Sequence, residues 1–495
     1  MKLLIELRPA LEGHAGIPQE ARLLFRGLGQ LAGTEVQGLI QSSDKFLNAG
    51  LPEPTLRGGA LPDHERIDRL SRVVISLQPP AAARSFLRRV VSRLTKILAL
   101  SGLLLRGALR LREKLTWFDA EHFKDFVWRS QFAKTLPIED FEQVTSATYR
   151  VARVPYGLMH MCGLATAKMG KAIYPRLDTH GVDVMLALTP YPATVALGTK
   201  LVVRYFDAVP LMMPHTIIHK ARHQALHYQA LRRNVASGAY FACCSDATRR
   251  DLIAVFPEVE SRAVTIPCML SHHYFLEESS PGRVPEILAK RLNPAAHVAP
   301  MAEAAVFEEA IGHQRGVDYL LMVSTLEPRK NHALLIEAWE QLKRESHPQL
   351  KLVLVGSLGW DHEHILERMK LWVQRGDVLL LSGVPAEELR VLYRHALTTV
   401  CPSVAEGFGY AGVEAMRCGG VVVASDIPVH REVYAEAAEY FNPYSATELV
   451  KAITCVIGPE QALRRRQLIE TGEPVSARYL SQEILPKWDR FLRTL

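Results

Sequence analysis

Two glutamates on either side of a glycine-rich turn have the residue types and spacing needed to bind a phosphate group and its hydroxyl-bearing neighbours. Glu406 and Glu414 flank a turn that contains Gly407, Phe408 and Gly409. The glycines allow the backbone to turn tightly and to approach a ligand closely. A helix that begins after the turn would offer unpaired N–H groups and the positive end of its dipole, which favour an anion such as a diphosphate.

The two carboxylates indicate which groups would surround that anion. A carboxylate next to a phosphate is repelled unless it accepts hydrogen bonds, and the hydroxyls of a sugar or a ribose are suitable donors. The alternative is that Glu406 begins a solvated loop and Glu414 lies on a surface helix. We favour the ligand-binding interpretation because the pair lies in a glycine-rich passage from a strand to a helix.

Two cations in a second motif can neutralise the same anion. Arg329 and Lys330 follow the apolar run 319–325, and Asn331 after them is suited to be the N-cap of the next helix. At the carboxyl edge of a sheet, the two cations could stabilise a leaving diphosphate without a metal. They could also be solvated loop cations, but the glutamate motif elsewhere in the sequence favours a role in binding. The sequence has no HExxH motif and no Cys/His cluster, so we expect no metal site.

The elements that must position these motifs are easiest to predict in the C-terminal part. From residue 318 on, short apolar runs alternate with helical patterns. The runs predict strands at 319–325, 351–357, 377–383, 398–403, 420–426 and 439–443. Continuous apolar strands separated by helices indicate a doubly wound parallel sheet, here a Rossmann-like domain over 317–476. Both motifs follow strands, at the edge where such sheets bind ligands.

The first 275 residues predict a second α/β domain. A loop with Gly13 and Gly16 follows its first strand, and a large helical insertion occupies about 55–150. We interpret 276–316 as the interdomain connection and 477–495 as a helix that packs back onto the first domain. Apolar runs indicate strands at 2–7, 182–188, 200–207, 239–245 and 263–268. Two such domains facing each other form a ligand-binding cleft.

The composition agrees with a two-domain protein in a reducing compartment. The chain has 495 residues, 48% of them hydrophobic, which allows large cores without disulfides. Its seven cysteines are scattered and show no CxxC spacing, which indicates buried thiols. The N-terminus lacks the pattern of a signal peptide, and the sequence has no run of about 20 apolar residues. We therefore expect a cytoplasmic protein.

One segment carries the excess of positive charge. The net charge is +7, and residues 84–114 contain nine Lys and Arg against one Glu, a local charge of +8. At helical spacing, its apolar residues share one broad face and most of its cations the other. A basic amphipathic helix suits an anionic membrane surface, which would place the protein peripherally on the inner face of the membrane. The helix could equally pack its apolar face on its own domain. Nucleic-acid binding is not expected, because aromatic residues are not interleaved with the cations.

The two motifs resemble the signature of the retaining GT-B glycosyltransferases of family 4. In that family, two glutamates separated by seven residues follow a strand and an Arg-Lys element lies upstream, as Glu406, Glu414, Arg329 and Lys330 do here. The resemblance is strong over about 316–460 and weaker over about 1–50 and 180–275. It implies the GT-B fold, in which two Rossmann-like, doubly wound parallel-sheet domains face each other across a cleft.

The resemblance also implies roles for individual residues. Glu406 would contact the hexose hydroxyls of a nucleotide sugar, Glu414 its ribose and Lys330 its diphosphate, with Arg329 beside it. Further donor contacts would come from uncharged positions. Gly13 and Gly16, in the glycine loop of the first domain, would approach the phosphates. Gly407, Phe408 and Gly409, in the turn between the glutamates, would pass close to the donor. The backbone of Gly383 and Val384 would contact the nucleobase.

Two places depart from the pattern of the family. Many relatives carry a basic residue directly after the first strand of the second domain, where this chain has Ser324 and Thr325, so Arg329 would take over that duty. Relatives often show a His-Asp pair after the strand equivalent to 200–207. Here Phe206 replaces the histidine, and Asp207 remains as a donor contact.

The resemblance therefore implies a hexosyltransferase that retains the anomeric configuration. The motif at 325–331 is similar to a subgroup rich in bacterial mannosyltransferases that build surface polysaccharides, which implies GDP-mannose as donor and a lipid-linked saccharide as acceptor. No cofactor is expected besides the nucleotide sugar itself. Two alternatives are a nucleotide-sugar epimerase on the same fold and a non-catalytic glycosyltransferase-like partner subunit, which Phe206 mildly favours.

Overall fold

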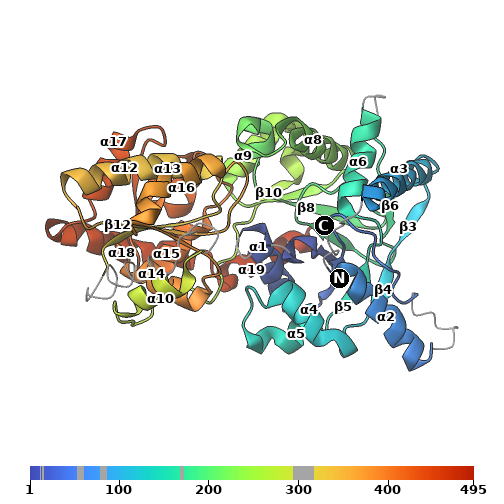
Figure 1. Cartoon of the computed structure of the whole chain (residues 1–495). Coiled ribbons are helices and arrows are strands. Elements are labelled where there is room, and N and C mark those ends of the chain that lie inside the picture. Colours follow the sequence, from blue (N-terminus) through green and yellow to red (C-terminus); the bar gives the residue numbers. More distant parts are fainter. Residues whose placement is uncertain (12, 14–15, 53–60, 79–85, 168–171, 294–316) are drawn as a thin grey trace.

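The chain folds into two α/β lobes that lie side by side (Figure 1). The structure is a computed structural model that describes residues 1–11, 13, 16–52, 61–78, 86–167, 172–293 and 317–495, with the backbone alone for 86–93. The N-terminal lobe is built around one mainly parallel sheet, and the C-terminal lobe around another. The prediction of two doubly wound parallel-sheet domains is confirmed.

The sheet of the C-terminal lobe has the strand order of a doubly wound nucleotide-binding domain. Its strands are parallel and lie in the order β13 (Val378–Leu381), β12 (Lys351–Val355), β11 (Tyr319–Val323), β14 (Thr398–Cys401), β15 (Val422–Ser425) and β16 (Ala438–Phe441). The chain moves outward from β11 to β13 and then returns to β14 on the other side of β11. This reversal between β11 and β14 is the switch point at which open sheets bind ligands.

Helices cover both faces of this sheet because successive strand residues point to opposite sides. Leu320 and Met322 of β11 belong to a cluster with α12 (His332–Glu345), α13 (Glu363–Gln374) and α17 (Ala446–Thr454). Tyr319 and Leu321 belong to the opposite cluster, with α14 (Ala386–His395), α15 (Tyr410–Arg417) and α16 (Pro428–Tyr434). Burial on both faces explains why the strands are continuously apolar in the sequence.

The sheet of the N-terminal lobe is larger and also reverses direction. Its order is β10 (Ala263–Thr265), β9 (Tyr240–Cys243), β8 (Lys200–Tyr205), β7 (Val184–Ala187), β1 (Lys2–Glu6), β2 (Glu35–Ile40), β5 (Thr148–Val151) and β4 (Thr116–Phe118). All neighbours are parallel except β4 and β5. The helices of this part are α1 (Ile17–Leu28), α6 (Tyr156–Ala167), α7 (Val209–Met212), α8 (Lys220–Ala236) and α9 (Asp246–Val255). The switch point lies between β1 and β7, so the loops after these strands face the second lobe.

The insertion at about 55–150 is not purely helical. It contains α2 (Asp63–Leu77), α3 (Phe86–Ala108), α4 (Lys124–Val127) and α5 (Phe141–Thr145). It also contains β4 and the short β3 (Arg112–Lys114), which pairs with β6 (Arg176–Asp178), and it ends in β5, which joins the main sheet beside β2. The insertion therefore extends the edge of the sheet as well as adding helices.

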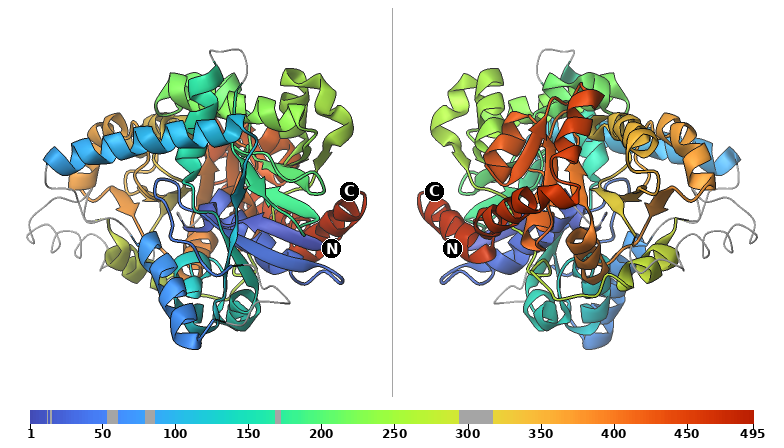
Figure 2. Two further views of the ribbon diagram at one scale, coloured as in Figure 1. Left: turned by 90° about the vertical axis from the view of Figure 1, so that its right-hand side faces the viewer. Right: turned by 90° about the vertical axis from the view of Figure 1, so that its left-hand side faces the viewer.

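The chain crosses between the lobes twice. After β10, Cys268 and Leu270 already pack in the core of the C-terminal lobe, and α10 (Arg283–Arg291) packs against α14 and β13 of that lobe. The rest of the expected connection, 294–316, lies outside the described residues. After α18 (Ala462–Ala477), the last helix α19 (Ser481–Arg493) returns and packs on α1, so the two termini lie close together (Figure 2).

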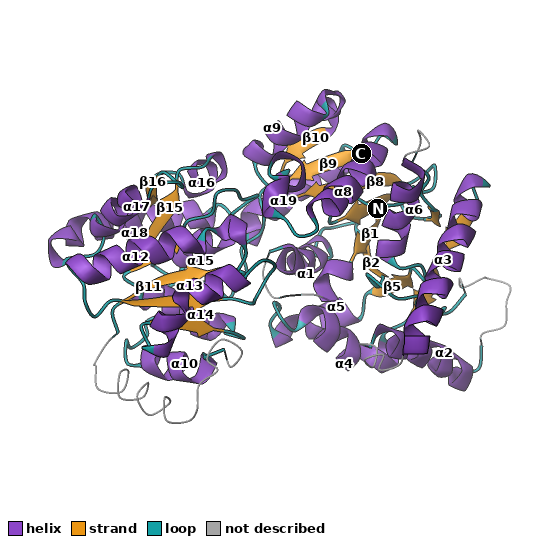
Figure 3. Cartoon of the chain, turned by 45° about the horizontal axis from the view of Figure 1, so that its top comes forward, coloured by secondary structure: helices purple, strands orange, loops and turns teal. Residues whose placement is uncertain are grey.

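The basic helix α3 packs part of its apolar surface on its own domain. It lies at the end of the N-terminal lobe that is remote from the C-terminal lobe (Figure 3). Leu103 is buried in the core of the lobe, and Leu100 and Leu104 pack against that core. Its other apolar side chains face solvent, each more than half exposed: Leu94, Ile97, Leu98 and Leu105. One side of the helix therefore anchors it, and another remains uncovered in the described chain.

Candidate active site

A cavity of about 480 Å³ lies between the two lobes. One wall comes from the loops that follow β11 and β14, the neighbouring strands at the switch point of the C-terminal lobe. The other wall comes from the segments that follow β1, β7 and β8 of the N-terminal lobe. Lys330 and Glu406, which are 76 residues apart in the sequence, therefore line the same cleft.

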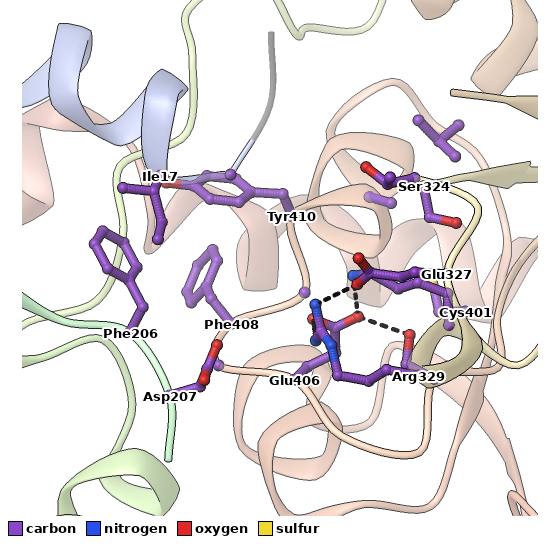
Figure 4. A pocket seen from close by; sticks show the side chains of 18 of the residues that line it. Ile17, Phe206, Asp207, Ser324, Glu327, Arg329, Cys401, Glu406, Phe408 and Tyr410 are labelled. Atoms are coloured by element: carbon purple, nitrogen blue, oxygen red, sulfur yellow. Dashed lines mark hydrogen bonds and ion pairs between the residues drawn. The ribbon is translucent and has the colours of Figure 1, made fainter. Parts of the chain in front are cut away.

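The carboxylate of Glu406 is the centre of a charged cluster on the C-terminal wall (Figure 4). Its Oε2 accepts a hydrogen bond from Arg329 Nη1 at 3.0 Å, and its Oε1 accepts one from Lys330 Nζ. Ser403 Oγ donates to the same Oε1 at 2.6 Å. On its other side, Arg329 Nη2 donates to Glu327 Oε1 at 2.8 Å. The two predicted cations therefore converge on the predicted glutamate.

Burial and charge act in opposite directions on these groups. Burial disfavours the ionised form of Glu406, but the Lys330 ammonium and the Arg329 guanidinium outweigh it and hold the pKa of Glu406 well below its usual range. Burial alone would lower the pKa of Arg329, yet Glu406 and Glu327 raise it above its ordinary value. At Glu327 burial dominates and raises the pKa of the carboxyl group. Glu406 and Arg329 are therefore both charged at neutral pH.

The glycine turn brings the amino end of α15 to the cavity and fastens the two lobes together. A Cβ on Gly407 would overlap the carbonyl oxygen of Phe206, which belongs to the other lobe. The carbonyl oxygen of Gly407 accepts a hydrogen bond from Ser245 Oγ at 2.9 Å. Gly409 has a φ of 86°, which a residue with a side chain rarely adopts. Gly407, Phe408 and Gly409 all line the cavity, as do the first residues of α15.

Glu414, in the second turn of α15, lies deeper in the same cavity. It is 4% exposed. Its Oε2 accepts a hydrogen bond from the Tyr393 hydroxyl at 2.9 Å, and its Oε1 accepts one from Gln19 Nε2 at 3.4 Å. Burial raises the pKa of Glu414 to about 7, although hydrogen bonds from Tyr393, Gln19 and Tyr274 oppose the shift. Since Gln19 belongs to α1, the other lobe holds part of this site.

The N-terminal wall contains some of the predicted residues. Gly16, with a φ of 71°, lines the cavity directly before α1. Phe206 and Asp207 follow β8 and also line it, and Asp207 Oδ1 accepts a hydrogen bond from the backbone N–H of Val209 at 3.1 Å. The position at which relatives carry a histidine is therefore occupied here by an aromatic ring on the cleft.

Gly13, Gly383 and Val384, which the resemblance also implied, are not among the described residues that line the cavity. The carbonyl oxygen of Gly13 accepts a hydrogen bond from Arg22 Nη2 at 2.9 Å, so Gly13 shapes the loop before α1. Gly383 and Val384 follow β13, the outermost strand, and are separated from the switch point by β12 and β11.

The prediction that Asn331 is the N-cap residue of α12 is confirmed. Asn331 occupies the N-cap position with a φ of 61°, but its side chain makes no capping hydrogen bond. Its Nδ2 donates instead to the carbonyl oxygens of Pro402 and Pro443, at 3.1 and 2.9 Å. Asn331 thus ties the Arg-Lys loop to the loop that leads to Glu406, which fixes the spacing of the charged cluster.

Three residues of the site were not found as functional by sequence reasoning. Ser403 and Glu327 lie within the two motifs but act only through contacts with Glu406 and Arg329, which follow from the adjacency of β11 and β14. Arg8, after β1, also lines the cavity, with its Nε donating to Glu6 Oε1 at 2.8 Å. An isolated arginine after a strand has no motif that would have identified it.

Two doubly wound domains that meet at a charged cleft define the GT-B fold. The structure resembles that of sucrose-phosphate synthase from Thermosynechococcus elongatus, with a TM-score of 0.55 and 15% identity over 100% of this chain and 98% of that one. It also resembles HepE from Anabaena in complex with UDP and glucose, with a TM-score of 0.50 and 19% identity over 72% of this chain and 88% of that one. The predicted fold class is confirmed.

Residues 306–473 match the family described as Glycosyl transferases group 1, so the C-terminal lobe is a domain of that group. The chain is similar to O-antigen chain mannosyltransferase B of Escherichia coli, 37% identical over 125 residues, which are 25% of this chain and 33% of that protein. It is also similar to O-antigen chain mannosyltransferase RfbU of Salmonella typhimurium, 35% identical over 127 residues, 26% of this chain and 35% of that protein. The chain thus matches about a third of the length of each relative.

Proposed function

We propose that this protein transfers a hexose from a nucleotide sugar to a saccharide acceptor with retention of the anomeric configuration. The convergence of Arg329, Lys330 and the amino end of α15 on one cleft carries the proposal. These groups would stabilise the negative charge that develops on a leaving diphosphate, each contributing about 2–4 kcal/mol in the transition state. Glu406 and Glu414, on the same cleft, would accept hydrogen bonds from hexose and ribose hydroxyls.

The proposed donor is GDP-mannose, and the proposed acceptor is a lipid-linked saccharide in the synthesis of a cell-surface polysaccharide. Two relatives that match about a quarter of the chain are named as O-antigen chain mannosyltransferases, which supports this choice. We also propose that the reaction needs no divalent metal, because Arg329, Lys330 and α15 can neutralise the diphosphate. Transfer activity should then persist in EDTA.

The surface of α3 supports a peripheral contact with a membrane. No described helix has the length and apolar character required to span a bilayer. Leu94, Leu98 and Leu105 are nevertheless exposed on α3, close in sequence to Lys96 and Arg106. Apolar side chains next to cations favour the interface of an anionic membrane. We therefore propose that the protein works at the cytoplasmic face of the membrane on which its acceptor resides.

A thermal-shift screen against GDP-mannose, UDP-glucose, ADP-glucose and dTDP-glucose tests the donor, since a ligand that binds only the native state raises the melting temperature. We expect selective stabilisation by GDP-mannose. The reaction itself is tested by incubating the protein with that donor and a mannose-terminated acceptor, and by NMR of the new anomeric bond. An altered sugar nucleotide formed without acceptor would identify an epimerase instead. Correct folding without transfer from any donor would favour the non-catalytic alternative.

A further inference from the structure

Two more cavities are lined by residues of the N-terminal lobe, beside the cleft. The first, which we name the imidazole pocket, has a volume of about 430 Å³ and shares Arg8 and Thr189 with the cleft. The second, which we name the α3 pocket, has a volume of about 530 Å³ and shares Gly157 and Arg222 with the imidazole pocket. Because neighbouring cavities share wall residues, the three lie next to one another between the reaction cleft and α3.

The imidazole pocket is lined by hydrogen-bonding groups, among them four histidines and two arginines. His223 and His227 lie four residues apart on α8, His219 directly precedes this helix, and His160 belongs to α6, which packs against α8. Burial lowers the pKa of His160 and of His227 to about 3, and it also lowers the pKa of His223. A neutral imidazole has one N–H donor and one acceptor nitrogen, which matches the hydroxyl groups of a saccharide.

The junction between the cleft and the imidazole pocket is rigidly built. The Arg8 guanidinium lies 3.8 Å from the centre of the Tyr156 ring, and its Nη2 donates to Thr189 Oγ1 at 3.2 Å. The Tyr156 hydroxyl lies 2.7 Å from the same Thr189 oxygen. Glu6, which is fully buried, forms an ion pair with Arg8. A hydroxyl that enters the cleft from the imidazole pocket would therefore meet preset polar groups.

The α3 pocket has a different character. Half of its twelve lining residues have apolar side chains: Phe46, Ile97, Leu100, Pro155, Leu158 and Met161. Arg222 stands where the two pockets meet, and Lys96 of α3 also lines the pocket. Within the described residues, neither cation forms an ion pair with a carboxylate, although Asp44 contributes to the same lining. Arg222 instead donates to Met161 Sδ at 3.3 Å.

We propose that the three cavities bind one amphiphilic acceptor in which an anionic group joins a saccharide to an apolar chain. The saccharide lies in the imidazole pocket with its reacting hydroxyl at Arg8 and Thr189. The anionic group, a phosphate diester or diphosphate in chemical class, lies at Arg222, and the first part of the apolar chain lies in the α3 pocket. This inference rests on the proposed function and specifies its acceptor.

The order of the cavities carries the argument. Hydroxyl-binding groups lie next to the cleft, a cation without a carboxylate partner in the described chain follows, and an apolar pocket comes last, bounded by a helix with exposed leucines. An amphiphile with these three parts in this order would match each cavity, whereas a soluble oligosaccharide would leave the α3 pocket unoccupied.

The test compares three probes that share one sugar: methyl α-mannoside, decyl α-mannoside and the decyl diester of mannosyl phosphate. Wild-type protein should bind the phosphodiester at least about 10-fold more tightly than the neutral decyl mannoside, because a charge-assisted contact is added. The decyl mannoside should in turn bind more tightly than the methyl mannoside. Binding is measured by calorimetry without a donor, and KM is measured in transfer with GDP-mannose.

Two variants locate the parts of the probe. Arg222→Gln should raise the Kd and KM of the phosphodiester about 10-fold and leave those of the methyl mannoside unchanged. Ile97→Ser should weaken both decyl probes about fivefold and again spare the methyl mannoside. Matched controls are Lys220→Gln, on the same helix as Arg222, and Leu371→Ser, an exposed apolar residue of the other lobe. Neither control should change the Kd or KM of any probe.

The outcomes separate this proposal from the proposed function. Equal binding of the three probes by the wild type, or equal loss for all probes in Arg222→Gln and Ile97→Ser, overturns the acceptor arrangement. If the probes bind in the expected order but no donor supports transfer, the arrangement stands and the proposed transferase activity is wrong.

Discussion

Replacing Glu406 with Gln isolates the charge that holds the cation cluster of the cleft together. The variant keeps the shape of the side chain, but one of its two terminal groups becomes an NH2 donor. That donor must face either the Arg329 guanidinium or the Lys330 ammonium, which are themselves donors. The other terminal atom can only accept a hydrogen bond without the attraction of a full charge. The cluster therefore loses both its anion and one of its contacts.

The contacts of Glu406 determine the size of the effect. Removing one partner from a buried ion pair costs about 3–5 kcal/mol. Arg329 keeps Glu327 as a partner at 2.8 Å, which limits the loss, so we expect the free energy of unfolding at pH 7 to fall by about 3 kcal/mol. Transfer should fall by about 100-fold or more, because a carboxylate that positions the sugar and orients both cations is gone.

Urea denaturation over a range of pH, with Glu439→Gln as control, measures the stability change. The folded-state pKa of Glu406 is depressed from 4.5, so its stabilising contribution is present above about pH 4.5 and is lost as the pH falls through the folded value. The difference in the free energy of unfolding between wild type and variant should be largest at pH 7 and should decrease in strong acid. Glu439 pairs with Arg464 outside the cleft, and its replacement should cost less than about 1 kcal/mol. Equal unfolding free energies for Glu406→Gln and wild type at pH 7 would refute the reasoning.

Two further substitutions probe the buried glutamate and the glycine turn. The folded-state pKa of Glu414 is raised from 4.5 to about 7. The free energy of unfolding of the wild type should therefore decrease by up to about 3 kcal/mol as the pH rises from 4.5 to about 7. Glu414→Gln should abolish this slope in denaturation experiments, and an unchanged slope would assign it to another group. Gly407→Ala should lower stability by about 1–3 kcal/mol and nearly abolish transfer, because its methyl group would collide with Phe206 across the cleft. Gly102→Ala, whose methyl group would meet no atom within 4 Å, is the control; it should keep transfer activity and be no less stable than wild type, since Ala favours a helix more than Gly does.

The fold of the C-terminal lobe could be predicted because its signals are local. Each of its strands is buried on both faces and separated from the next by a helix, so apolar runs alone locate them. In the N-terminal lobe, β2 and β5 were not predicted, because they contain residues that are unusual in a buried strand. Only the pairing of the two strands explains these residues. Gln37 is buried and accepts a hydrogen bond from Arg150 Nε at 2.8 Å, and Gly38 leaves room for the ring of Tyr149. Neither contact is visible in the sequence of one strand.

The candidate site was predicted in its parts but not in its arrangement. The motifs around Glu406 and Lys330 have recognisable residue types, and the structure places both on one cleft. The sequence did not predict that Glu406 itself pairs with Arg329 and Lys330, since this contact depends on the distance between the loops after β11 and β14. The contribution of Gln19 to Glu414 depends on how the lobes meet, which no single-domain pattern encodes.

The last helix has a consequence for how the protein is made. Trp488, Ile484 and Leu492 of α19 are buried in the core of the N-terminal lobe, beside residues of α1 and β1. That lobe leaves the ribosome first, yet its hydrophobic core stays open until residues 481–493 have been synthesised. Nascent chains therefore expose this apolar surface until α19 has been made, and exposed apolar surface favours aggregation.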